Sequence, residues 1–312
     1  SGPPVVERAI GEKLSKEELG GWKMHVVESG QIDNVAEDED DAFQQIREFL
    51  SYLPNTVREV APRVNTGDDP ERRPQELLDF VPTNRRQGYD ARALIRHVVD
   101  NGDFFEMREL YASGLITGFA RLDGWSVGVI GSDPMSKAGA MDGNAADKYT
   151  HFLDLCDTFN LPLLIFLDMP GFMLGSHAER IATMRRGARA LIASAECQVP
   201  KIEFMVRKSY GVAADAPNSI GLPNSINLRF GWPSGEWGGI PIEGGVAAAY
   251  RREIAEADDP DAHRAEIEDR LLRLRSPFRA AHRGDVVDLI DPRETRALAC
   301  RFINLAQPKL AE

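Results

Sequence analysis

The sequence LPLLIFL, Leu161–Leu167, is followed directly by Asp168-Met169-Pro170-Gly171-Phe172. A short, continuous apolar run that ends in turn residues is typical of a buried β-strand. A second run of this kind, KIEFMV, spans Lys201–Val206, and the residues between the two runs predict a helix from about Ala178 to Cys197. This alternation of strand, helix and strand predicts an α/β fold with a mainly parallel sheet.

The chain on both sides of this stretch extends the same pattern. Two β-rich runs, Ile116–Leu122 and Trp125–Ile130, are separated by Asp123-Gly124, a dipeptide that favours a tight hairpin. Residues 54 to 88 are rich in proline and charge and predict a linker. Helices are also expected at Phe43–Leu50, Leu94–Val99 and Pro260–Arg275, together with one that ends at Phe159 and one that begins near Val246. A short strand is expected at Val286–Ile290, followed by a last helix. The stretch Gly211–Gly245 is rich in Gly, Pro and Asn.

The composition excludes several classes of protein. The 312 residues are 43% hydrophobic, and 37 basic against 49 acidic side chains give a net charge of −12. Such a chain is neither disordered nor fibrous, and the acidic balance argues against a nucleic-acid partner. No apolar run approaches the ~18 residues of a membrane span, and the start of the chain lacks the features of a signal peptide, so a cytoplasmic protein is expected.

The cysteines and histidines do not indicate side-chain catalysis or a metal site. Cys156, Cys197 and Cys300 lie far apart without a C-x-x-C spacing, which predicts buried thiols and no metal. The sequence contains none of the common nucleophile, zinc-protease or P-loop motifs. Two Gly-containing loops remain, one at Asp168–Phe172 and one at Arg207–Asp215, each of which is either a simple strand-to-helix turn or a set of backbone donors for an anion.

Many short motifs of this sequence occur in the same order in a known protein family. The sequence resembles the carboxyltransferase β subunit of biotin-dependent acyl-CoA carboxylases, of the propionyl- or acetyl-CoA carboxylase type, over essentially the whole chain. The residues that carry this resemblance include Thr117–Arg121, Asp142–Ala145, Asp168, Pro170–Phe172, Gly187-Ala188, Val199–Lys201, Arg207-Lys208, Tyr210-Gly211 and Asp291–Arg296.

The resemblance implies a fold and an organisation. The fold would be a crotonase-like spiral of ββα units, preceded by part of a second such domain. Residues 1–75 would be the tail of the acyl-CoA-side domain plus a linker, and residues 76–312 the complete C-terminal, biotin-side domain. The implied partners are a biotin carboxyl carrier or biotin carboxylase subunit and the missing carboxyltransferase half, in a homo- or hetero-oligomer, with no membrane.

The resemblance also implies an activity and its site. The chain would transfer the carboxyl group from carboxybiotin, held on a separate carrier domain, to the α-carbon of an acyl-CoA. The backbone N–H groups of Val212 and Ala213 would form the oxyanion hole, and Asp215 would lie at the pocket floor and sort acyl groups. Gly171, Phe172 and Gly211 would contact both substrate and biotin, and Tyr210 the substrate.

Other functions remain open at the level of sequence. The chain could serve as a biotin-dependent decarboxylase subunit, or as a crotonase-type hydratase or isomerase with Glu236 or Glu243 as the base. It could also be a non-catalytic assembly subunit, because the bulky Val212 stands where the family usually has a small residue, and a β-branched side chain tolerates unusual backbone angles poorly. Further departures from the family occur at Ala216–Ile220 and Glu236–Gly245.

Overall fold

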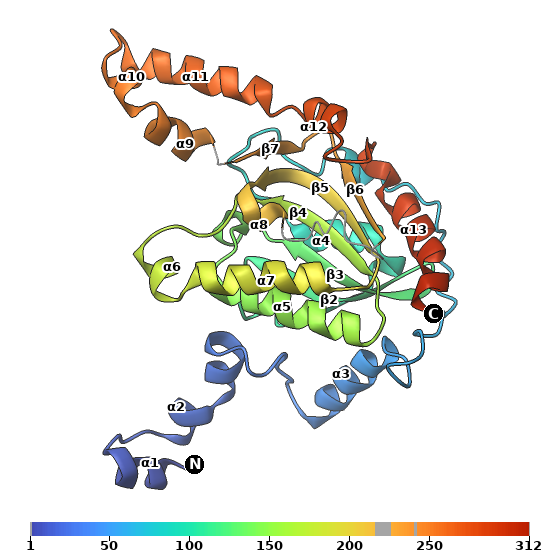
Figure 1. Ribbon diagram of the computed structural model, residues 1–312. Coiled ribbons are helices and arrows are strands. Elements are labelled where there is room, and N and C mark those ends of the chain that lie inside the picture. The colour runs from blue at the N-terminus through green and yellow to red at the C-terminus, as the bar shows by residue number, and fades with distance from the viewer. Residues whose placement is uncertain (1, 216–225, 240–241, 312) are drawn as a thin grey trace.

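The computed structural model describes residues 2–215, 226–239 and 242–311. One sheet lies at the centre of the molecule, with α5 and α7 on one face and α4 and α13 on the other (Figure 1). The strands are β1 (Phe104–Met107), β2 (Leu115–Leu122), β3 (Trp125–Ser132), β4 (Leu163–Met169), β5 (Lys201–Tyr210), β6 (Asn227–Gly231), β7 (Glu236–Gly238) and β8 (Asp288–Leu289).

The order of the sheet is β1-β2-β3-β4-β5-β6-β8, and β7 pairs separately with the end of β5. The first three strands are antiparallel and the others are parallel, so the prediction of a mainly parallel sheet is confirmed. Asp123 (φ 50°) and Gly124 (φ 79°) join β2 to β3, as the hairpin prediction requires. Gly124 is needed here because a Cβ atom would lie 1.8 Å from the carbonyl oxygen of Val64.

The sheet separates two apolar cores, which explains the continuous apolar run of β4. Leu163, Ile165 and Leu167 pack into one core together with α5 and α7. Leu164 and Phe166 point to the opposite face and pack with α4 and α13. Since successive strand residues face opposite sides, a strand covered on both faces must be apolar throughout.

The helices lie largely where the sequence predicts them, and four of the described helices begin at an aspartate cap. Asp38, Asp90, Asp142 and Asp259 accept backbone N–H groups of the first turns of α3, α4, α5 and α11. The helices are α1 (Pro3–Ile10), α2 (Lys16–Gly20), α3 (Glu39–Ser51), α4 (Ala91–Val98), α5 (Gly143–Thr158), α6 (Ser176–Arg180), α7 (Thr183–Glu196), α8 (Gly211–Asp215), α9 (Ile242–Ala249), α10 (Arg251–Ala255), α11 (Pro260–Leu274), α12 (Pro277–Arg283) and α13 (Thr295–Leu310).

Two predicted segments differ in the structure. The helix expected from Ala178 to Cys197 is broken into α6 and α7, because Ala182 adopts a left-handed conformation (φ 56°). The stretch Gly211–Gly245, expected to lack regular structure, contains α8, β6 and β7 and the start of α9.

The strand expected at Lys201–Val206 continues to Tyr210, so the second predicted loop starts only at Gly211. Two contacts explain the extension. β7 pairs with Lys208–Tyr210, and Asp168 neutralises Arg207, which would otherwise be a buried cation. The departure at Ala216–Ile220 lies outside the described residues.

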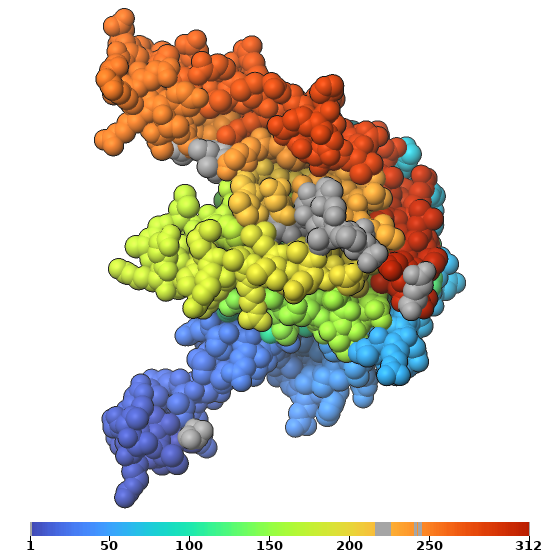
Figure 2. All heavy atoms as spheres, in the orientation of Figure 1, coloured from blue at the N-terminus to red at the C-terminus, as the bar shows by residue number. Residues whose placement is uncertain are grey.

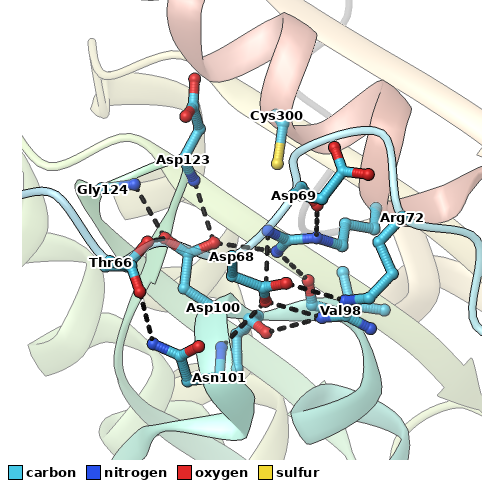
Figure 3. A network of polar contacts seen from close by, with 12 residues as sticks. Thr66, Asp68, Asp69, Arg72, Val98, Asp100, Asn101, Asp123, Gly124 and Cys300 are labelled. Atoms are coloured by element: carbon cyan, nitrogen blue, oxygen red, sulfur yellow. Dashed lines mark hydrogen bonds and ion pairs between the residues drawn. The ribbon is translucent and has the colours of Figure 1, made fainter.

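The predicted linker crosses the molecule as an irregular strap, and a polar network fastens it (Figure 3). Asp100 is 1% exposed and is the centre of this network. Its carboxylate accepts the Oγ1–H group of Thr66 on the strap and the backbone N–H groups of Asp123 and Gly124, and lies 2.9 Å from Nη1 of Arg296 on α13. The strap, the hairpin turn and α13 are thereby joined at one buried carboxylate.

Two parts of the chain extend away from the central sheet. In Figure 1, α1 and α2 project to one side, and α9–α11 form an arm at the opposite end. Figure 2 shows the surface hollowed between this arm and the α6–α7 segment. The three cysteines are buried free thiols, as predicted. Within the described ranges, no helix combines the length and the apolar character that crossing a bilayer demands.

Candidate active site

A cavity of about 690 Å³ lies where β5 ends and α8 begins. It contains three of the residues that the sequence singled out: Gly211, Val212 and Asp215. The full lining is Ser209, Gly211, Val212, Asp215, Arg229, Trp237, Gly238, Gly239, Arg283, Gly284 and Asp285. The site therefore forms at the carboxyl ends of parallel strands, where α/β proteins bind their ligands.

Gly211 makes the sharp change from strand to helix. Its φ of 64° lies in the left-handed region, and an added Cβ atom would lie 3.3 Å from the carbonyl oxygen of Gly239. Val212 follows in α8 without a positive φ, and its side chain is 58% exposed. The unusual backbone angle thus falls on the glycine, and Val212 is an exposed residue of the cavity wall.

Ala213 is the third residue of α8 and is fully buried. Its methyl group packs into the core shared with α5 and α7, and Ala213 is not among the residues that line the cavity. The first N–H groups of a helix have no partner within the helix, so Val212 and Ala213 each carry such a donor. The structure therefore places Val212 at the cavity, whereas the side chain of Ala213 lies in the core.

The other predicted loop lies beside the cavity without lining it. Gly171 has a φ of 116°, and a Cβ atom there would lie 3.3 Å from the carbonyl oxygen of Tyr210. The ring of Phe172 packs against Gly187 of α7, where an added Cβ atom would lie 2.4 Å from its Cζ atom. Gly171 therefore permits the close approach of the two loops, and Phe172 holds its loop on α7.

The side chain of Tyr210 is buried and joins β5 to β7. Its hydroxyl donates to Oε2 of Glu236 at 2.5 Å, and Nη2 of Arg85 lies 2.6 Å from the same oxygen. Burial raises the pKa of Tyr210 to about 12. Glu236, one of the two bases considered for a hydratase, is thus engaged by a cation and a phenol, while the side chain of Glu243 lies outside the described atoms.

A buried ion pair fixes the ends of β4 and β5 relative to each other. Oδ2 of Asp168 lies 2.9 Å from Nη2 of Arg207, and Oδ1 accepts the backbone N–H group of Lys208 at 3.0 Å. Arg207 also donates to the carbonyl oxygen of Gln87. These contacts set the position from which the chain enters Gly211.

Arg229, which no sequence motif indicated, lines the cavity from β6. Its Nε atom lies 2.6 Å from Oε2 of Glu203 on β5, and both side chains are 4% exposed. Its Nη1 atom lies 3.7 Å from Oδ1 of Asp215, whose own side chain is 70% exposed. The sequence signal that could have found Arg229 is an opposite charge at the paired position of a neighbouring strand, since Glu203 and Arg229 are register partners.

The family model for the carboxyl transferase domain matches residues 1–311. The chain is 40% identical over 297 residues to the carboxyltransferase subunit of propionyl-CoA carboxylase from Haloferax mediterranei, covering 95% of this chain and 57% of that protein. It is 38% identical over 296 residues to the alpha subunit of methylmalonyl-CoA decarboxylase from Veillonella parvula, covering 95% of this chain and 56% of that protein.

Solved structures agree with these relatives. The transcarboxylase 12S subunit, crystallised as a hexamer with methylmalonyl-coenzyme A and methylmalonic acid bound, superimposes with a TM-score of 0.90 at 38% identity. The match covers 99% of this chain and 59% of that one. The expected crotonase-like α/β fold and the family resemblance are both confirmed, while the chain spans less than two thirds of the relatives that it matches.

Proposed function

Because this chain belongs to the carboxyl transferase domain family, we propose that it supplies carboxyltransferase activity to a biotin-dependent acyl-CoA carboxylase. It would move a carboxyl group from carboxybiotin to the α-carbon of an acyl-CoA. The observation that carries the proposal is the cavity at the start of α8, which combines a strand-to-helix glycine with first-turn backbone amides. That arrangement occurs in a chain 40% identical to a propionyl-CoA carboxylase subunit.

The cavity fits the cofactor that this function requires. Its volume of about 690 Å³ lies within the ~300–1,000 Å³ range of small-molecule sites. The backbone amides at the start of α8 would be its donors, and such groups suit an acceptor oxygen that gains negative charge. When bound, carboxybiotin supplies the carboxyl group, and its ureido oxygen bears the charge that remains after the carboxyl group has left.

The residues of this chain would act chiefly by orientation. The amides of Val212 and Ala213 would donate to the developing oxyanion, and a preorganised donor of this kind contributes about 3 kcal/mol to transition-state stabilisation. Gly211 admits the substrate close to the backbone because it carries no side chain. Gly171, Phe172 and Tyr210 would hold the site in shape, and Asp215 would limit the acyl group at the cavity wall.

We propose the domain organisation that the resemblance implies. Residues 76–312 would form the biotin-side domain, and residues 1–75 would belong to the acyl-CoA-side half. Several large apolar side chains in this first part are exposed, among them Ile10, Trp22, Phe43, Ile46 and Leu50. Such a surface supports a partner half, in an oligomer that also receives a biotin carboxyl carrier.

Carboxyl transfer can be measured directly. The chain, combined with its carrier and with the remaining carboxyltransferase half, is given labelled carboxybiotin and propionyl-CoA, and labelled acyl-CoA is quantified. Label in the acyl-CoA is expected. Label that stays in carboxybiotin or appears only as CO₂ would contradict the proposal.

A biotin-dependent decarboxylase subunit is the second candidate, supported by the similarity to the Veillonella protein. With methylmalonyl-CoA and free carrier, that function predicts rapid loss of CO₂ without carboxylation of propionyl-CoA. A hydratase would instead act on an enoyl-CoA without biotin, and the engagement of Glu236 by Arg85 and Tyr210 speaks against it. If the assembled complex shows none of these activities, the chain is a non-catalytic assembly subunit.

A further inference from the structure

Two charged side chains lie buried on neighbouring strands at the cavity. Glu203 and Arg229 are register partners on β5 and β6, and both side chains are 4% exposed. Only part of their hydrogen-bonding capacity is used within the described residues, because Nη2 of Arg229 and Oε1 of Glu203 have no hydrogen-bond partner there. Buried ion pairs contribute little net stability compared with apolar side chains, so their presence beside a cavity calls for a functional explanation.

The pair reaches the cavity through Asp215. Nη1 of Arg229 lies 3.7 Å from Oδ1 of Asp215, which is the last residue of α8. In the described part of the chain, Arg229 forms an ion pair with this carboxylate, and Nε of Arg229 lies 2.6 Å from Oε2 of Glu203.

We propose that Arg229 is a positioning residue for acyl selection, which holds the carboxylate of Asp215 at the cavity wall. Glu203 fixes the guanidinium on the sheet, so the shape of the acyl end of the cavity is set from the sheet as well as by α8. This inference rests on the proposed function, since it concerns which acyl-CoA the cavity accepts. It adds a residue that acts on acyl selection through the position of Asp215.

A neutral pair tests the proposal without leaving an unpaired buried charge. In the double variant Glu203→Gln/Arg229→Gln, two neutral amides replace the ion pair, one equal in size to Glu203 and one shorter than Arg229. The kcat/KM values for propionyl-CoA and octanoyl-CoA are compared with those of the wild type, of Asp215→Asn and of the triple variant. A purely structural role would lower both values equally and leave their ratio unchanged.

The double variant is expected to change the ratio about tenfold, in the same direction as Asp215→Asn. The triple variant is expected to stay within twofold of the double variant, because the two changes act through one carboxylate. The same exchange at an exposed pair, Arg252→Gln in α10 with Glu256→Gln just after this helix, should leave the ratio unaltered. An unchanged ratio in the Glu203/Arg229 variant, or fully additive effects with Asp215→Asn, would overturn the proposal.

A second measurement separates this inference from the proposed function. Crystal structures of the wild type and the Glu203→Gln/Arg229→Gln variant should show the carboxylate of Asp215 displaced in the variant. If the wild type transfers no carboxyl group, the proposed function is wrong, and the crystal structures still decide whether Arg229 anchors Asp215. An Asp215 side chain that keeps its place without Arg229 would refute the anchoring.

Discussion

Nη2 of Arg207 lies 2.9 Å from Oδ2 of Asp168, and the two side chains are 3% and 1% exposed. The pair joins the carboxyl ends of the central strands β4 and β5. It stands directly before Gly211, where the candidate active site begins. The position of α8 relative to β4 and β5 therefore depends on this contact.

Asp168→Asn should strongly destabilise the protein, because it leaves the guanidinium of Arg207 buried without a counter-charge. Removing one partner of a buried pair typically lowers the free energy of unfolding by about 3–5 kcal/mol. Urea denaturation measures this change. The control is Asp269→Asn, which breaks an exposed pair with Arg273 and should alter stability by about 0.5 kcal/mol or less. Equal effects of the two substitutions would refute the structural role of Asp168.

Ala213→Pro should lower the rate of carboxyl transfer by about 10²-fold or more, since it removes one proposed oxyanion donor. Proline is tolerated in the first turn of a helix, and Ala213 is the third residue of α8. The thermal midpoint must remain close to that of the wild type before the rate is interpreted.

Val212→Ala is the matched control for this experiment. It keeps the backbone donor and shortens a side chain that is 58% exposed, so activity should be unchanged or higher. A folded Ala213→Pro variant with near-normal transfer would move the oxyanion hole to another loop.

The stability contributed by Lys148 should depend on pH. Its Nζ atom donates to the backbone carbonyl oxygens of Arg108, Tyr111 and Leu115, and burial lowers its pKa from 10.5 to about 7. Between these two values the unfolded chain binds more protons than the folded chain, so the free energy of unfolding rises with pH.

This effect is isolated by comparison with Lys148→Met. The wild-type stability minus that of the variant should increase by about 1 kcal/mol per pH unit between roughly pH 7.5 and 9. Chemical denaturation at several pH values measures both proteins, and all other titrating groups cancel in the difference. If the unfolding free energies of the two proteins change in parallel over this range, the pKa of Lys148 is not lowered in the folded protein.

Asp100→Ala should release the strap that Figure 3 shows, because Thr66, the hairpin turn and Arg296 lose their common acceptor. A loss of about 3 kcal/mol of local stability makes amide exchange about 100-fold faster. Hydrogen exchange of residues 64–72, followed by mass spectrometry, tests this. Glu71→Gln, which breaks an exposed pair with Arg301, is the control and should leave exchange unchanged.

The sequence predicted those elements whose stability is local. The continuous apolar run of β4 and the Asp123-Gly124 turn carry their own signals, and both are confirmed. The last residues of β5 were wrongly assigned to a loop because they are polar. Arg207 is neutralised by Asp168, which lies 39 residues earlier, and composition does not show such a partner.

The candidate site was predictable to a similar degree. Gly211 was recognisable as a strand-to-helix turn, and the cavity forms there. Arg229 was missed because an isolated arginine in an Asn-rich stretch reads as an exposed loop residue, whereas Glu203 allows it to be buried in β6. The roles of Val212, Ala213 and Asp215 stay predictions that the experiments above decide.

The order of the strands in the sheet has a consequence for synthesis. From β1 to β6 each new strand pairs with the one made just before it, so the sheet can grow as the chain leaves the ribosome. The strap is different, because the carbonyl oxygen of Asp69 is bound by Arg296, 227 residues later. The strap can bind Asp100 and the hairpin turn early, through Thr66 and Val64, but this last contact waits until α13 has been made.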